Sequence, residues 1–392
     1  MKENKSQEPK VLAREFHAKR VAHLKLKEVF DRLSWIVEQE PENVEDIVLL
    51  VGPSGCGKST LMKRLEADIH SKYLADMESD PGFVPVIYSR LTAPQDGNFN
   101  WKDFFSRLLE AFNDILIRKK VILHPEAMLD GEIIVSIRAL VREELRRAVR
   151  NAFAFRRTKF LLLDEAGHLL LTKSSLPARV QFELIKSVAQ ELHIPIILAG
   201  DYSLLRILEL NGQLTRRTEV VHFSRYSVEE MSDPKSEAGQ SFRNTVFSLL
   251  EALPLQRDDG LVEHMDYFYQ FSIGNVGLLK KWLQRALWLA LKSEKKVLTR
   301  AILESTRIKN KALKLLLDEA ILGETTLEDV DDDELTRALG LASTPSIHVI
   351  TGNFRFTEGN DGPAKAKRRT SKKRPGTRKP GRDPVGGIPR AA

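Results

Sequence analysis

A glycine-rich stretch has the residue types and spacing needed to bind phosphate. The sequence GPSGCGKST fits the pattern G-x-x-x-x-G-K-[ST] between an apolar run and an amphipathic segment. Glycines let backbone N–H groups wrap a phosphate, and the helix that follows directs its positive end toward it. We expect Lys58 to reach the β- and γ-phosphates of a nucleotide and Ser59 to hold Mg²⁺. The residues predicted to bind the nucleotide, called the phosphate loop below, are Gly52, Pro53, Ser54, Gly55, Cys56, Gly57, Lys58, Ser59 and Thr60.

A second chemical signal is the acidic pair within KFLLLDEAGH. An apolar strand there delivers Asp164 to the sheet edge at which a nucleotide's metal ion is held, and places Glu165 beside it. We predict that Asp164 binds Mg²⁺ and that Glu165 polarises a water for attack on the γ-phosphate of ATP. The pair favours hydrolysis over kinase chemistry, in which the nucleophile is a substrate. The alternative interpretation is an acidic cap on the next helix.

Three further polar residues are candidates for the same site. Asp201 ends the apolar run IPIILAG, where it could contact the γ-phosphate or the attacking water, or could cap the helix that follows. Arg216 and Arg217 precede TEVVHFSRY. Either could reach the γ-phosphate of a neighbouring subunit, and arginines supplied in this way are worth roughly 10³ to 10⁵ in rate. The alternative is a solvated pair beside Glu219.

Strands that alternate with helices must position these residues. Apolar runs are expected to form strands at Ile47–Val51, at Phe83–Leu91, and within KFLLLDEAGH, IPIILAGDY and TEVVHFSRY, with helical segments between them. This alternation predicts an α/β fold with a parallel five-stranded sheet covered on both faces. After about Ser227 only helical patterns follow. The predicted parts are an N-terminal helical segment (1–45), an α/β ATPase domain (46–226), an all-helical lid domain (227–323) and a flexible acidic-then-basic tail (324–392).

Composition limits the class of protein. The 392 residues are 42% hydrophobic and 29% charged, which fits a soluble globular protein of two or three domains. A single cysteine, Cys56, excludes an internal disulfide and favours a reducing cytoplasm. No apolar run approaches the roughly 18 to 20 residues that cross a bilayer, so no membrane partner is expected. The net charge of +7 is uneven, because residues 363–392 carry +10 and the remainder −3.

Basic residues are the candidates for contact with a polyanion. Arg138, Arg142 and Arg146 recur at i, i+4 and i+8 on a long predicted helix and could follow a DNA backbone, and Lys119 and Lys120 precede that helix. A solvated helix face is the alternative, since acidic residues intervene. The basic tail could capture DNA phosphates, contact a protein partner or only confer solubility. We predict double-stranded DNA as a partner.

Together these motifs resemble the AAA+ ATPases, and specifically the TnsC/TniB branch of transposition regulators. The resemblance covers roughly residues 20 to 320 and uses, besides the phosphate loop and the acidic pair, the segments QLTRRTEVVHFSRY and SIGNVGLLKKWL. It implies ATP-dependent self-assembly, as a ring or helical filament, on double-stranded DNA in a bacterial cytoplasm. It also implies a target-selection protein of the TniQ or TnsD kind and a transposase as partners, with the nucleotide as a clamp and timer. We expect a Mg²⁺-dependent ATPase, and the departure described next is consistent with a slow one.

One departure and two alternatives accompany this interpretation. Many AAA+ lids carry an arginine in a G-x-x-R pattern, whereas this chain has Gly277 at that place and Lys280 and Lys281 one turn later. Lid control of hydrolysis is therefore not assured. A replication initiator or helicase loader would share the ATPase core, although no folded DNA-binding module is expected after Leu322. A signalling switch ATPase would use the same site to control protein partners without nucleic acid.

Overall fold

The computed structural model describes residues 9–39, 47–93, 99–113, 133–171, 178–209, 218–233, 235–261 and 264–341. Residues Met1–Asp329 belong to one compact unit and residues Val330–Ala392 to a second. The described part of the second unit contains helix α16 (Asp332–Ala338), within the stretch predicted from sequence to be a flexible tail. None of the described helices combines the length and apolar character that a membrane span requires.

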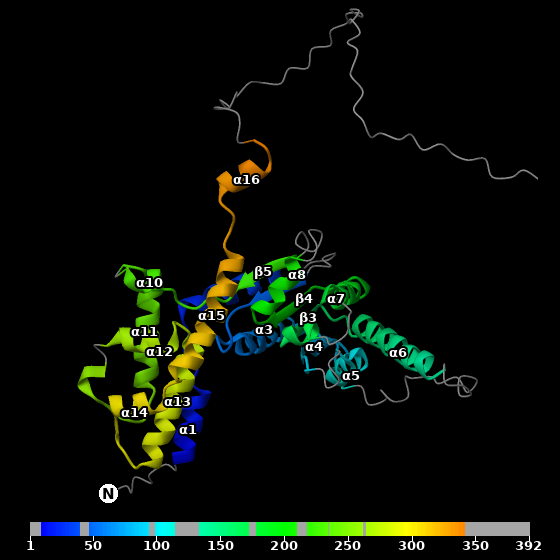
Figure 1. Ribbon diagram of the computed structural model, residues 1–392. Helices are drawn as coiled ribbons and strands as arrows, with labels where there is room; N and C mark the ends of the chain where they lie inside the picture. Colours follow the sequence, from blue (N-terminus) through cyan, green and yellow to red (C-terminus); the bar gives the residue numbers. More distant parts are fainter. Residues whose placement is uncertain are drawn as a thin grey trace, which may run out of the picture. The chain divides into compact units, whose positions relative to one another are not determined.

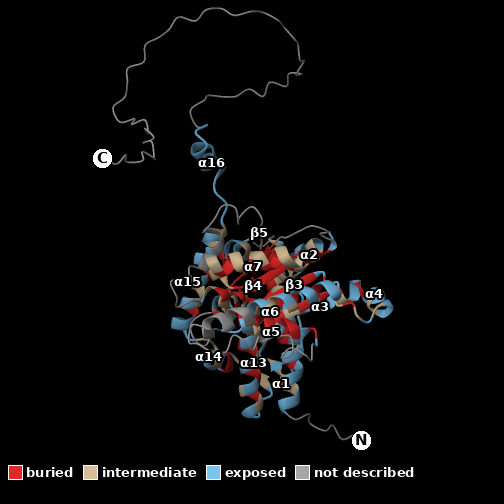
Figure 2. Ribbon diagram, turned by 90° about the vertical axis from the view of Figure 1, so that its right-hand side faces the viewer, coloured by how far each residue is buried: buried red, intermediate tan, exposed pale blue. Residues whose placement is uncertain are grey.

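A parallel sheet of five strands lies at the centre of the first unit (Figure 1). Its strands are β1 (Ile47–Val51), β2 (Val86–Arg90), β3 (Phe160–Asp164), β4 (Ile196–Gly200) and β5 (Thr218–His222), in the order β2-β3-β4-β1-β5. Every residue of β1, β3 and β4 is buried, as expected where helices cover both faces (Figure 2). The predicted α/β fold with five parallel strands is confirmed.

Alternate residues of β1 enter two different cores. Val48 and Leu50 pack with helices α2 (Leu24–Glu38) and α3 (Lys58–Lys72), whereas Leu49 and Val51 face the opposite layer. That layer consists of α5 (Trp101–Ala111), α6 (Ile133–Phe155) and α7 (Ala178–Leu192). Because the phosphate loop leads into α3, the α3 face is the face on which a polar residue at a strand end can reach the nucleotide.

The helical region has a core of its own. It comprises α10 (Val228–Ser232), α11 (Glu237–Glu251), α12 (Met265–Ser272), α13 (Val276–Lys292) and α14 (Arg300–Thr306). Trp282, Phe242 and Phe268 are among the largest buried side chains in this core. The expectation of helices alone was wrong in one detail, because β6 (Gln256–Arg257) and β7 (Val297–Leu298) form a parallel pair. Strands of two residues are too short to give a periodic pattern in the sequence.

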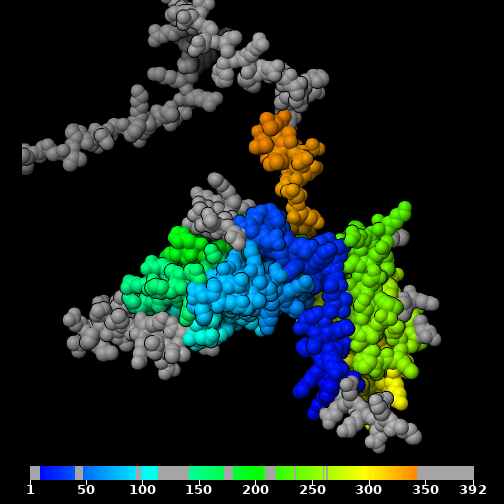
Figure 3. All heavy atoms as spheres, turned by 180° about the vertical axis from the view of Figure 1, so that it is seen from behind, coloured from blue at the N-terminus to red at the C-terminus, as the bar shows by residue number. Residues whose placement is uncertain are grey.

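The N-terminal segment joins the two cores. Helix α1 (Pro9–Ala18), which lies within the predicted N-terminal helical segment, inserts Phe16 into the core of the helical region. Helix α2 packs on the sheet instead, through Val29, Leu33 and Val37. Figure 3 shows this N-terminal stretch running beside the helical region. Residues 9–38 therefore bind the sheet and the helical region to each other.

Helix α15 (Asn310–Leu327) returns from the helical region to the sheet. Its Gly323 lies against the ring of Tyr202, so close that a Cβ atom at Gly323 would be 2.0 Å from a ring carbon. The next residue, Glu324, accepts a hydrogen bond of 2.9 Å from Arg225, which follows β5. This contact places the end of α15 directly beside the strand end that carries Asp201. The remaining short elements are α4 (Leu74–Ser79), α8 (Arg206–Glu209), and the 3-10 helices η3 (Ala166–Leu170), η4 (Tyr202–Leu205) and η5 (Asp259–Leu261).

Candidate nucleotide-binding site

The phosphate loop connects β1 to α3 and depends on glycine at three positions. Gly55 and Gly57 have φ angles of 83° and 115°, a left-handed conformation that residues with a Cβ rarely adopt. Gly52 is needed for a different reason, because a Cβ there would lie 2.3 Å from the carbonyl oxygen of Phe223. The backbone of Phe223 in turn donates to the Val51 carbonyl at 2.7 Å. The shape of the loop is thus fixed by its own glycines and by the segment that follows β5.

The ammonium group of Lys58 lies inside the loop. Its Nζ atom donates to the carbonyl oxygens of Gly52 at 2.7 Å and Pro53 at 2.9 Å. Helix α3 begins at this residue, and Ser59 and Thr60 occupy its first turn, where the helix dipole favours an anion. Cys56 is buried in the same turn, and burial raises the pKa of its thiol, so it is a neutral packing residue.

Asp164 ends β3 on the α3 side of the sheet. Phe160 and Leu162, four and two residues earlier, pack in the core that contains α3, and the alternation of the strand turns Asp164 to the same face. The side chain is held through both oxygens. Oδ2 accepts from the Tyr88 hydroxyl at 3.0 Å and Oδ1 accepts from the Glu165 N–H at 2.9 Å. The residue is only 2% exposed, but each of its carboxylate oxygens accepts a hydrogen bond from the protein.

Glu165 lies in a strained turn between β3 and η3. Its φ of 56° is left-handed, which is uncommon for a residue with a side chain. The carboxylate accepts from Arg90 at 2.7 Å, and both partners of this ion pair are substantially exposed. Arg90 was not among the residues predicted from sequence. The sequence indicates Arg90 only as a basic residue at the end of an apolar strand. Its contact with Glu165 depends on the β2–β3 register, which pairs Arg90 with Asp164.

Asp201 follows β4, which lies between β1 and β3 in the sheet. The order of strands places this residue between the phosphate loop and the acidic pair. Its Oδ1 atom accepts from the Ser203 N–H at 2.9 Å and so caps η4, as one of the two interpretations of the sequence required. The carboxylate also faces Gly167 in η3, just after Glu165. A contact with the γ-phosphate remains a prediction that this position allows.

The N-terminus of α13 presses directly on the phosphate loop. Asn275 caps this helix through Oδ1, which accepts from the N–H groups of Gly277 and Leu278, while its Nδ2 donates to the Ser54 carbonyl at 3.2 Å. Gly277 is so close that a Cβ there would lie 1.7 Å from the carbonyl oxygen of Gly55. The position at which the sequence lacks the expected arginine is therefore one where no side chain fits.

The two lysines after Gly277 have different surroundings. Lys281 places its Nζ atom 3.7 Å from the position that a Cβ on Gly55 would occupy, and so lies beside the phosphate loop. Lys280 points to α1, where its Nζ donates to the carbonyl oxygens of His17 at 2.9 Å and Lys19 at 2.5 Å. Of these two lysines, only Lys281 is positioned to add positive charge to the candidate nucleotide site. The sequence alone did not separate the two, because they are adjacent.

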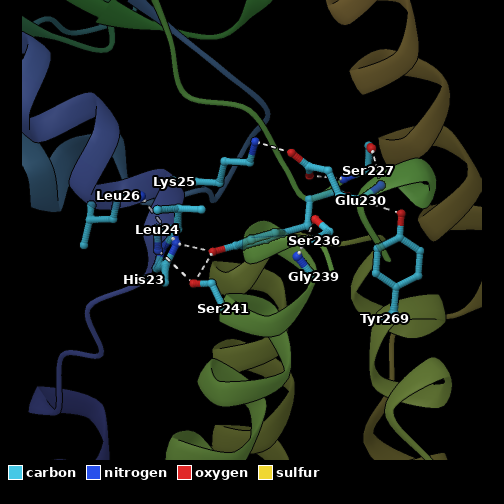
Figure 4. A network of polar contacts seen from close by, with 11 residues as sticks. His23, Leu24, Lys25, Leu26, Ser227, Glu230, Ser236, Gly239, Ser241 and Tyr269 are labelled. Carbon is cyan, nitrogen blue, oxygen red and sulfur yellow. Dashed lines mark hydrogen bonds and ion pairs between the residues drawn. The ribbon is translucent and has the colours of Figure 1, made fainter. Parts of the chain in front are cut away.

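A network of polar contacts fastens the N-terminal segment to the linker after β5 (Figure 4). The His23 Nδ1 atom is 3.2 Å from the Tyr226 hydroxyl, and the Leu24 N–H donates to the Ser241 hydroxyl at 3.0 Å. Lys25 forms an ion pair with Glu230 at 2.5 Å. Burial lowers the pKa of His23 to about 4, so its ring is neutral. This ring also stacks on that of Phe223, at 6.1 Å between centroids, which connects the network to the phosphate loop.

The predicted DNA contacts are only partly within the described residues. Arg146 is engaged by protein, since its guanidinium donates to both oxygens of Glu191 and to the Ser187 hydroxyl. Arg142 is 49% exposed, with Glu143 at 3.5 Å. Outside the described residues lie Lys119, Lys120, the side chain of Arg138, the two candidate arginines Arg216 and Arg217, and the basic tail 363–392. The i, i+4, i+8 stripe is thus not uniform, because Arg146 would have to leave Glu191 to meet a phosphate.

Residues 42–208, which hold the phosphate loop, the acidic pair and Asp201, match the family model of the AAA domain. The chain contains an AAA domain. Among solved structures, the chain is similar to the Orc1 protein of Aeropyrum pernix in complex with DNA, with 17% identity, a TM-score of 0.48, and coverage of 76% of this chain and 68% of that one.

Two further structures are similar at comparable distance. A Walker-type ATPase of Pyrococcus abyssi has 18% identity and a TM-score of 0.40, covering 83% of this chain and 80% of its own. The RuvB Holliday junction branch migration motor of Thermotoga maritima has 16% identity and a TM-score of 0.36, covering 80% and 82%. At these values the likeness says nothing about what this chain binds. No match was found among curated proteins.

Proposed function

We propose that this AAA protein is an ATP-dependent regulator of DNA transposition. It would assemble on double-stranded target DNA, link a target-selection protein of the TniQ or TnsD kind to a transposase, and disassemble when ATP is hydrolysed. The observation that carries the nucleotide-dependent part is the direct contact between α13 and the phosphate loop. The transposition role rests on the resemblance of the sequence segments described above.

The residues present fit a magnesium nucleotide. Gly55 and Gly57 allow the left-handed turns of the phosphate loop, Lys58 and the start of α3 supply positive charge, and Asp164 supplies a buried, oriented carboxylate. Mg²⁺ is usually held by few protein ligands together with substrate phosphates. A set of two protein ligands, Ser59 and Asp164, agrees with this preference. When bound, ATP would supply the γ-phosphoryl group, and Glu165 would accept a proton from the attacking water. Lys281 would add a second cation from the helical region.

Nucleotide-dependent assembly follows from where α13 lies. Because Asn275 and Gly277 contact the loop backbone, phosphates that reshape the loop must also act on α13 and on the helical region attached to it. A neighbouring subunit would complete the site through Arg216 or Arg217, which remains a prediction. ATP would thereby favour one arrangement of sheet and helical region, and that arrangement would favour association of subunits.

The proposed DNA contact is electrostatic and independent of base sequence. Its support is the charge of +10 on residues 363–392, together with the exposed Arg142 on α6. Contacts of this kind go to phosphates and weaken steeply as salt is raised. A bacterial cytoplasm is the proposed location.

The first test is electron microscopy of the full-length protein with duplex DNA of unrelated sequence. A slowly hydrolysed ATP analogue is compared with ADP, at low and at physiological salt. Rings or filaments on DNA with the analogue, but not with ADP, are expected. Particles that ignore DNA with both nucleotides would contradict the proposal and favour a signalling switch ATPase.

Glu165→Gln tests the timing role of hydrolysis. The amide cannot accept the proton of the attacking water, so ATP turnover should fall by roughly 10²-fold or more, while ATP binding is retained. Assemblies on DNA should then persist after dilution into ATP, as followed by fluorescence anisotropy of labelled duplex. Asp103→Asn, which removes an exposed carboxylate from an ion pair on α5, is the matched control. Dissociation of Glu165→Gln at the wild-type rate would argue against hydrolysis as the release step.

A further inference from the structure

Strand β2 carries a hydroxyl group that contacts the candidate metal ligand. Tyr88 pairs in register with Leu162 of β3, and its side chain extends along the same face to Asp164, two residues further on. The hydroxyl donates to Asp164 Oδ2 at 3.0 Å, and the Glu165 N–H already occupies Oδ1 at 2.9 Å. One donor on each oxygen fixes the rotation of the carboxylate.

The geometry makes Tyr88 a hydrogen-bond donor to the carboxylate. Its hydroxyl hydrogen is directed to Oδ2 of Asp164, whose own oxygens can only accept. A phenol that donates its hydrogen keeps lone pairs that can accept one from a neighbouring water.

We propose that Tyr88 is a positioning residue for metal–nucleotide binding, orienting the Asp164 carboxylate toward the Mg²⁺ that accompanies the nucleotide. The inference rests on the proposed function, since it assigns a role within the same site. Partners that hydrogen-bond a metal-binding carboxylate orient it, and their removal typically lowers metal affinity 10- to 100-fold. With Asp164 only 2% exposed, water cannot readily replace the missing donor.

A merely structural hydroxyl would behave differently. Tyr88 packs against the α3-side core as a partly buried side chain, and Phe at this position keeps that packing. Tyr88→Phe therefore removes the hydrogen bond alone. If the hydroxyl served only to satisfy a buried carboxylate, its loss would lower thermal stability without a selective effect on the metal.

The test measures metal binding rather than turnover. Full-length wild-type and Tyr88→Phe proteins are saturated with ADP and titrated with Mn²⁺, whose free fraction is read by electron paramagnetic resonance. Nucleotide affinity is measured separately in EDTA. The matched control is Tyr267→Phe, because the Tyr267 hydroxyl is buried in the helical region without a hydrogen-bond partner among the described residues.

Tyr88→Phe should bind Mn²⁺ about 10-fold more weakly while its metal-free ADP affinity stays within twofold of wild type. Tyr267→Phe should match wild type in both assays. In an Asp164→Asn background, the same change should have little further effect, because the group that Tyr88 orients is already lost. Undiminished Mn²⁺ affinity in Tyr88→Phe, or an equal loss with and without metal, would overturn the assignment. Failure of the wild type itself to bind Mn²⁺ with ADP would instead overturn the proposed function.

Discussion

The ion pair between Arg90 and Glu165 determines how available the candidate base is. The Arg90 guanidinium lies 2.7 Å from Oε1 of Glu165 and so competes with water for that oxygen. The residue that the mechanism requires to act on water is therefore held by a neighbouring strand.

Arg90→Ala should increase ATP turnover in the absence of DNA several-fold, because it releases Glu165. Stability should change little, since both partners are exposed and such pairs contribute little to folding. A coupled phosphate-release assay and a melting curve test both expectations. Arg107→Ala, which breaks an exposed pair with Asp103 on α5, provides the control. Slower turnover in Arg90→Ala would show that Arg90 assists the chemistry instead of restraining it.

Residues of the site differ in how far the sequence could predict them. Lys58, Ser59 and Asp164 belong to local patterns in which a strand leads into a loop. Lys58 and Ser59 begin α3, and Asp164 is the last residue of β3. Tyr88 and Arg90 act across the β2–β3 register, and Lys281 acts across the contact between α13 and the phosphate loop. Such contacts join positions about 75 to more than 220 residues apart, and no short-range pattern reports them.

At the scale of elements, the start of α13 is the feature that connects the phosphate loop to the helical region. The contact depends on the absence of a side chain at Gly277 and on the bond from Asn275 to Ser54. Backbone atoms on the loop side cannot move aside as a flexible side chain would. Any group added at Gly277 must therefore displace the helix or the loop.

Gly277→Ala should weaken nucleotide binding by roughly 10-fold or more, because its Cβ would lie 1.7 Å from the Gly55 carbonyl oxygen. Gly260→Ala is the matched control, since a Cβ there meets nothing within 4 Å. A fluorescent nucleotide analogue measures affinity, and melting curves without nucleotide show whether the fold is intact. Equal affinity in the two variants would mean that α13 does not restrain the loop.

The elements themselves were largely predictable where their patterns are long. The continuous apolar strands and helices such as α2 and α13 follow their periodicity closely. Helix α1 falls within the predicted N-terminal helical segment, but its packing was not predicted, because Phe16 is buried against a distant part of the chain. The pair β6–β7 was missed because two residues carry no period.

At the scale of the whole first unit, two segments distant in sequence connect the sheet to the helical region. Residues 9–38 do so from the N-terminal side, and the end of α15 does so through Gly323 and the Arg225–Glu324 pair. The N-terminal segment contacts Phe223 and the end of α15 contacts Tyr202, and both of these residues lie next to the candidate nucleotide site. Changes at the nucleotide can thus reach the helical region by routes other than α13.

The N-terminal connection should make stability depend on pH. Burial holds the pKa of His23 at about 4, against about 6.5 in an unfolded chain, so between these values only the unfolded state takes up the proton. The contribution of a neutral His23 is complete above about pH 6.5 and is lost as the pH falls toward 4. At pH 5 the unfolding free energy is lower than at high pH by about 2 kcal/mol because of His23. His222, whose pKa is also lowered to about 4 by burial and then by Lys25, acts in the same direction.

His23→Asn separates this effect from general acid sensitivity. Asparagine can still cap α2 and cannot be protonated, so the loss of unfolding free energy between pH 7 and pH 5 should be smaller than in wild type by about 2 kcal/mol. Urea unfolding followed by tryptophan fluorescence at the two pH values measures the difference. His264→Asn changes an exposed histidine at the start of α12 and should leave the wild-type pH dependence intact. If His23→Asn lost as much stability as wild type, His23 would already be protonated in the folded protein, and the N-terminal segment would have to tolerate a buried charge beside Tyr226 and Phe223.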